Sequence, residues 1–126
     1  MKIAIATTLV PFVYGGAEFL VEALEKQLLM RGHEVQLISF PFSWSPLDHI
    51  IDNVMAVRLT RIEGADMVIA MKFPAYYIDH PNKKMWLIHQ FRQAYDMSGT
   101  VYDIFTASQS DQAIKKAIID ADNKYL

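Results

Sequence analysis

Two adjacent glycines, Gly15 and Gly16, followed by Ala17 and Glu18, are the residues best suited to chemistry in this chain of 126 residues. Residues 2–8 before them (KIAIATT) are small and apolar, which predicts a buried strand, and a helical pattern follows them. Glycine lets the backbone approach a ligand closely because it has no Cβ. The N–H groups at the start of a helix attract anions, phosphate above all. We therefore expect Gly15, Gly16 and Ala17 to bind phosphate.

Alternating strands and helices must position this loop. The helix after it has apolar residues at helical spacing and ends at Gly32, and a second strand follows over residues 35–40. A helix from Ser45 to Gly64, strands at 67–71 and 84–89, and a helix from residue 114 onward complete the pattern. This order predicts an α/β fold with a Rossmann-like, doubly wound, mostly parallel sheet, in which strand 2–8 is central. Ligands bind such sheets beyond the carboxyl ends of the strands.

Several function classes are disfavoured. The GxGxxG motif is absent and the second strand ends in Phe40-Pro41-Phe42, so we expect no nicotinamide cofactor. The net charge of −2 comes from interspersed acidic and basic residues, which argues against nucleic acid as a partner. The pattern shows neither a metal cluster nor a pair of catalytic carboxylates, and there is no cysteine. No apolar run reaches the roughly 20 residues of a membrane span, so a cytoplasmic location is expected.

The loop at residues 15–18 (GGAE) and the later residues 32–35 (GHEV) resemble the amino-terminal domain of retaining glycosyltransferases of family 4, which have the GT-B fold. Residues 65–70 (ADMVIA) are similar to the family's next buried strand. Residues 85–90 (MWLIHQ) are similar to the strand that ends in an active-site histidine. The resemblance covers the whole chain.

This resemblance implies that the full-length protein is a hexosyltransferase of glycan biosynthesis. It would transfer a sugar from a nucleotide-sugar donor to a hydroxyl of a glycan or small-molecule acceptor. His89 is then the catalytic candidate because it would contact the transferred sugar, and the donor phosphate and sugar would meet Gly15, Gly16 and Ala17. The nucleotide sugar is a co-substrate, and no cofactor or metal is expected.

The loops at the carboxyl ends of the strands are rich in aromatic residues, which suit stacking on sugars or docking of a second domain. The other interpretation is that about half of these rings fill the core. The acceptor-side candidates are Phe12, Tyr14, Glu18, Lys72 and Phe73. Glu18 is also explained by the helix dipole alone, since an acid in the first turn is stabilising.

Residues 1–126 are long enough for a single domain. Members of the resembled family also need a carboxy-terminal donor domain, which this sequence lacks. We therefore expect a truncated piece or a stand-alone half that is inactive by itself. Its exposed cleft face could self-associate, and the full-length protein could bind the membrane peripherally. The alternative is a non-catalytic α/β module that binds carbohydrate or another protein.

Overall fold

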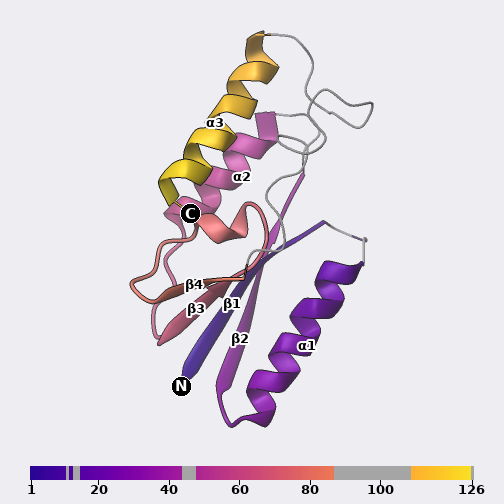
Figure 1. The fold of residues 1–126 in the computed structure, drawn as a ribbon, viewed down its shortest axis with the longest axis vertical. Helices are drawn as coiled ribbons and strands as arrows, with labels where there is room; N and C mark the ends of the chain where they lie inside the picture. Colours follow the sequence, from indigo (N-terminus) through magenta and orange to yellow (C-terminus); the bar gives the residue numbers. More distant parts are fainter. Residues whose placement is uncertain (11, 13–14, 44–47, 87–108, 126) are drawn as a thin grey trace.

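The chain forms an α/β fold with a parallel sheet and helices on both faces (Figure 1). The computed structural model describes residues 1–10, 12, 15–43, 48–86 and 109–125. In chain order the elements are β1 (Lys2–Leu9), α1 (Gly16–Met30), β2 (Glu34–Pro41), α2 (Asp48–Leu59), β3 (Met67–Ala70), the 3₁₀ turn η1 (Ala75–Tyr77), β4 (Lys83–Met85) and α3 (Gln109–Tyr125). No helix among these residues has the length and apolar character needed to cross a membrane.

The described strands form one four-stranded sheet in the order β2-β1-β3-β4, and every neighbouring pair is parallel. The prediction of a parallel sheet with the first strand inside is therefore confirmed. Ile5 of β1 lies opposite Leu37 of β2 and Ile69 of β3. Because alternate residues of a strand face opposite sides, these three residues share one face of the sheet. The fold is consistent with a Rossmann-like arrangement.

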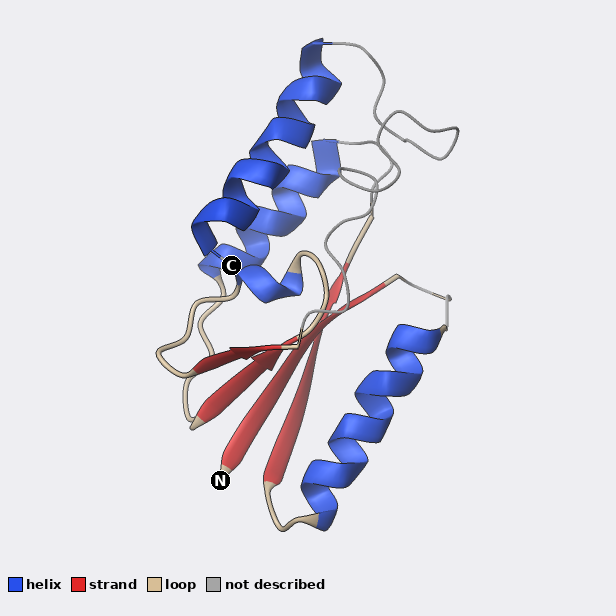
Figure 2. Cartoon of the chain, in the orientation of Figure 1, coloured by secondary structure: helices blue, strands red, loops and turns tan. Residues whose placement is uncertain are grey.

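The helices divide between the two faces of the sheet, with α1 on one and α2 and α3 on the other (Figure 2). Under α1, the buried residues Ile5, Val21 and Met71 form one apolar cluster. On the opposite face β1 presents the small residues Ala4 and Ala6, whose size leaves room for the side chains of α2, η1 and α3. The central strand β1 is buried over residues 3–8, whereas the edge strand β2 keeps exposed residues along its length.

The ends of α1 and α2 can be compared with the helix ends predicted from the sequence. Gly32 follows α1 with φ +84°, a conformation that glycine adopts without strain, so the predicted stop of this helix is confirmed. The second helix was expected to reach Gly64 but ends at Leu59. The N–H of Thr60 donates to the Val57 oxygen at 3.1 Å, a tightening typical of a last turn. Residues 87–89 of the expected last strand lie outside the described residues.

The aromatic residues after β3 lie in the core. Tyr76 and Tyr77 are fully buried and Phe73 is 6% exposed. The Phe73 ring meets the rings of Phe42, Tyr76 and Tyr77 edge to face, with centroids 5.6–5.8 Å apart. For these four rings the core-filling interpretation is therefore the correct one, and the expectation that Phe73 lies free on the acceptor side is corrected. Burial of such rings removes a large apolar surface from water, which is favourable.

A polar cluster attaches α3 to this aromatic core. Asp122 of α3 is 2% exposed, and its Oδ1 accepts hydrogen bonds from the hydroxyls of Tyr76, at 3.1 Å, and of Tyr77. Burial raises the pKa of Tyr77 far above its usual range, and the neighbouring Tyr76 and the bond to Asp122 add to the shift. Arg58 of α2 donates to the backbone carbonyl oxygen of Tyr77 at 2.8 Å, and its guanidinium lies 4.0 Å from the centre of the Tyr125 ring. These contacts join α2, η1 and α3.

Candidate functional site

The candidate site lies at the carboxyl ends of β1, β2 and β3, where parallel strands share one rim. Gly15 precedes α1 on this rim, and Lys72 follows β3 after one residue. Glu18 of α1 joins them. Its Oε2 accepts the Gly15 N–H at 3.0 Å, and its Oε1 lies 3.4 Å from the Lys72 Nζ. The structure therefore brings together three residues that the sequence singled out.

Glu18 and Lys72 form a partly enclosed ion pair. Their side chains are 19% and 26% exposed. Burial alone would raise the pKa of Glu18, but the backbone N–H donors and the Lys72 ammonium outweigh it and hold that pKa below its ordinary value. The carboxylate therefore stays charged at neutral pH and keeps the ammonium near the start of α1. Glu18 lies in the first turn of α1, as the helix-dipole interpretation expects, and its acceptor-side role stays a prediction.

The glycines begin the helix without unusual backbone strain. Gly15 is extended, with φ −150° and ψ −164°, and Gly16 and Ala17 form the first turn of α1. A Cβ built on Gly15 would come no closer than 3.6 Å to a neighbouring atom, the Glu18 Oε2, which is ordinary contact. The fold itself therefore has room for a side chain at position 15. Only a ligand that approaches the backbone closely would require glycine at position 15.

The remaining predicted residues fall into three groups. Phe12 is fully exposed and has φ 64°, so its ring stands free on the glycine loop. Phe73 belongs to the core and has no free ring face for an acceptor. Tyr14 and the catalytic candidate His89 lie outside the described residues, so their predicted roles stay predictions.

A cavity of about 200 Å³ opens beside the ion pair, between α1 and the ends of β1 and β2. Its apolar wall consists of Leu9, Val21 and Leu37. Its polar lining includes the hydroxyls of Thr7 and Ser39 and the charged groups of Glu18, Glu22 and Lys72. We call this space the Thr7 cavity. It lies where ligands bind in open parallel sheets.

The two threonines at the end of β1 have different partners. The Thr8 hydroxyl accepts the Ala75 N–H at 3.3 Å on the α2 face of the sheet. The Thr7 hydroxyl, on the α1 face, makes no hydrogen bond to any residue that the structure describes, although Thr7 is only 6% exposed. No fully buried side-chain nitrogen or oxygen in the described ranges lacks a partner. The Thr7 hydroxyl therefore keeps its accessible surface toward the cavity that it lines.

Sequence reasoning did not find Thr7 and Ser39. The available signal was their position, since each is a hydroxyl residue at the end of a strand in a fold that binds ligands at that edge. Which of two successive hydroxyls faces an open space depends on the strand register and on the helix above it. That information is absent from the pattern of residue types.

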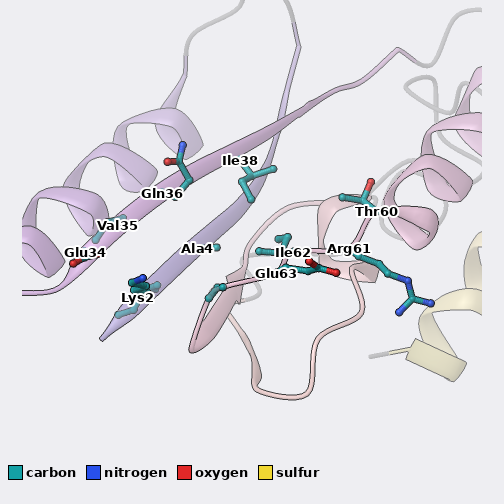
Figure 3. Close-up of a pocket in the computed structure, with 13 residues that line it drawn as sticks. Lys2, Ala4, Glu34, Val35, Gln36, Ile38, Thr60, Arg61, Ile62 and Glu63 are labelled. Carbon is teal, nitrogen blue, oxygen red and sulfur yellow. The ribbon is translucent and has the colours of Figure 1, made fainter.

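A second cavity, of about 440 Å³, lies at the opposite edge of the sheet (Figure 3). Residues of the amino halves of β1 and β2, such as Lys2, Ala4 and Gln36, line one side, and residues 60–65 after α2 line the other. It is larger than the Thr7 cavity but is remote from the glycine loop. Because ligands of parallel sheets bind at the carboxyl edge, we place the candidate site at the Thr7 cavity.

Within the described ranges, the His, Asp and Glu side chains form no group of three or more that could hold a metal ion. Comparison of the chain with protein-family models, with curated proteins and with solved structures finds no match.

Proposed function

We propose that this chain is the amino-terminal, acceptor-side domain of a retaining glycosyltransferase with the GT-B fold. One observation carries the proposal: Gly15, the start of α1 and Lys72 meet at the carboxyl edge of a parallel sheet, linked by Glu18. The sequence resemblance supplies the reaction class. A carboxy-terminal domain would hold most of the donor nucleotide, and the transfer would occur between the two domains.

The proposed roles follow from charge. During transfer the bond between the sugar and the donor phosphate breaks, and the nucleoside diphosphate leaves. Negative charge therefore grows on its phosphates. The N–H groups of the first turn of α1 and the Lys72 ammonium are positive groups fixed in place before the reaction, and such groups stabilise developing charge. Glu18 positions Lys72. His89 would contact the transferred sugar, as the resemblance implies.

A binding experiment tests this proposal on the chain itself. Titration of the ¹⁵N-labelled protein with uridine and guanosine diphosphates should shift the amide signals of residues 15–18. Gly15→Ala and Lys72→Met should each weaken binding, because the first adds a Cβ to the approach path and the second removes a cation. Lys84→Met is the matched control, since Lys84 is exposed on β4. Unchanged amide signals at millimolar diphosphate would end the assignment.

A transfer assay tests the two-domain mechanism. The 126-residue chain with labelled nucleotide sugars should give no measurable turnover, and turnover by the chain alone would contradict the mechanism. In the full-length enzyme, His89→Ala should lower the rate more than it lowers the melting temperature. If neither the 126-residue chain nor the full-length protein binds a nucleotide, but both bind glycans, the binding-module alternative is the correct one.

A further inference from the structure

We propose that two copies of this chain pair through the outer edge of β2 and join their sheets into one. This contact lies at the side of the sheet, whereas the proposed function uses the carboxyl rim. Three features of β2 support it: its unpaired backbone groups, its residue types and the position of its proline.

The outer edge of β2 presents unpaired backbone N–H groups. β2 is the last strand on its side of the described sheet. The N–H groups of Glu34, at its start, and Phe42, just past its end, donate to backbone oxygens of the first-strand segment at 3.0 and 2.9 Å, and the register between them is unbroken. Because backbone groups alternate between the two sides of a parallel strand, the intervening odd-numbered residues point theirs outward. No residue that the structure describes accepts from these N–H groups, which belong to Val35, Leu37 and Ser39.

The residue types of β2 leave this edge unprotected. Residues 35–40 (VQLISF) carry no charge and are mostly β-branched, apolar or aromatic. Natural proteins usually protect an edge strand by making it short or by placing lysines on it. β4, at the other end of the described sheet, has three residues, of which Lys83 and Lys84 are two, whereas β2 has eight residues and no lysine. A long uncharged edge of this kind is a template for another strand.

A two-fold axis at Leu37 pairs this edge with itself. In the antiparallel register centred there, Leu37 lies opposite Leu37 of the second copy, and Val35 lies opposite Ser39. Each such pair exchanges two hydrogen bonds. The outward N–H and C=O groups of all three residues therefore find partners. The weak bond from the Gln36 amide to the Leu37 oxygen, 3.4 Å long, would give way to a backbone bond.

The ends of β2 favour this register over its neighbours. Moving the partner strand by two residues in one direction places Pro41 opposite Val35, and proline has no N–H to donate. Moving it the other way places His33 opposite Ser39, but His33 precedes the strand and its N–H already donates to the Leu28 oxygen at 3.2 Å. A shift by one residue would present groups that already bind β1.

The charges of β2 permit this pairing. Glu34 is the charged residue of the strand and lies opposite Phe40 of the second copy. The two Glu34 residues are therefore six positions apart along the paired strands, or about 20 Å. Gln36 lies opposite Ile38. Within the paired strands no like charges face each other, a situation that would destabilise the pair. A second copy is thus the occupant that the pattern of β2 fits.

Cysteine cross-linking tests the register, because the chain has no cysteine of its own. Leu37→Cys should give a disulfide-linked dimer under mild oxidation, since the Cα atoms of a hydrogen-bonded antiparallel pair are about 5.5 Å apart, within the range of a disulfide. Ser39→Cys is the matched control on the same edge. Its two copies would be four positions apart, about 13 Å or more, so it should stay monomeric on a non-reducing gel. Equal cross-linking of both variants would overturn the inference.

Sedimentation equilibrium measures the association itself. The wild-type chain should reach about twice the monomer mass at submillimolar concentration. Ser39→Pro removes an outward N–H but no bond within the protomer, so it should keep the circular dichroism spectrum and weaken the dimer about ten- to a hundredfold, as expected for two net hydrogen bonds. Ser39→Ala keeps the N–H and should leave the dimer unchanged. If Ser39→Pro does not fold, the cross-linking variants decide.

A monomer over the whole concentration range would overturn the inference. A dimer that Phe12→Ser dissociates and Ser39→Pro does not would also overturn it, because Phe12 stands exposed at the rim and the contact would then be the cleft face. Diphosphate binding at residues 15–18 depends on neither result. The proposed function therefore stands or falls separately.

Discussion

Replacing Asp122 by alanine should destabilise the fold strongly, because two buried tyrosine hydroxyls lose their common acceptor. The hydroxyls of Tyr76 and Tyr77 both donate to Asp122 Oδ1, and both residues are fully buried. A buried donor that loses its acceptor costs about 1–3 kcal/mol. Tyr77 keeps a longer contact to the Ile118 oxygen at 3.4 Å, which offsets part of its loss.

We therefore expect a fall of about 2–4 kcal/mol in the free energy of unfolding. This is a large share of the roughly 5–15 kcal/mol typical of a domain. Asp120→Ala is the matched control, since Asp120 is exposed on the same helix and carries the same gain in helix propensity. Urea titrations followed by far-ultraviolet circular dichroism measure both variants.

Adding Tyr76→Phe and Tyr77→Phe to Asp122→Ala should recover part of the lost stability, because the two hydroxyls that donated to Asp122 are then removed together with their acceptor. If Asp122→Ala lies within about 0.5 kcal/mol of Asp120→Ala, a difference usual for surface substitutions, the anchoring role of Asp122 is refuted.

Three further predictions concern pH and backbone conformation. Because burial raises the pKa of Tyr77, stability should be constant below the ordinary tyrosine pKa and fall as pH rises above it, with a smaller fall in Tyr77→Phe; urea midpoints in alkaline buffers measure this. Gly32→Ala should cost about 1 kcal/mol or more because φ is +84°, whereas Gly15→Ala should be neutral or stabilising by up to about 1 kcal/mol; thermal melts that reverse this ranking contradict it. Because the pKa of Glu18 is lowered, its stabilisation should be present above the ordinary carboxyl pKa and lost as pH falls through the folded-state value. Glu18→Gln should reduce this acid-side loss, and an unchanged acid titration of stability would count against the ion pair with Lys72.

The first strand, first helix and second strand could be predicted because their signals are local. The small and apolar residues at 2–8, the helical spacing of Leu20, Val21 and Leu24, and the glycine at 32 are signals that each act over a few neighbours. The parallel order then followed because a helix between two strands carries the chain back to the edge where the first strand began. These expectations agree with β1, α1 and β2 as the structure has them.

The roles of the aromatic residues after β3 could not be predicted in this way. A ring on a loop at the carboxyl edge can face a ligand or the core, and the residue type is the same in both cases. Phe73, Tyr76 and Tyr77 face inward because α3, far along the chain, covers them and supplies Asp122. Burial depends on which elements meet, and that is a property of the assembled fold.

The sequence by itself thus determined the parallel sheet, the helix that begins at the glycine loop and the edge at which a ligand is expected. The tertiary structure alone decided that Glu18 pairs with Lys72, 54 positions away, and that the Thr7 hydroxyl, unlike that of Thr8, stays without a partner in the described residues. Local patterns record the preferences of neighbours, whereas contacts between distant residues depend on strand register and on the helix packed above them.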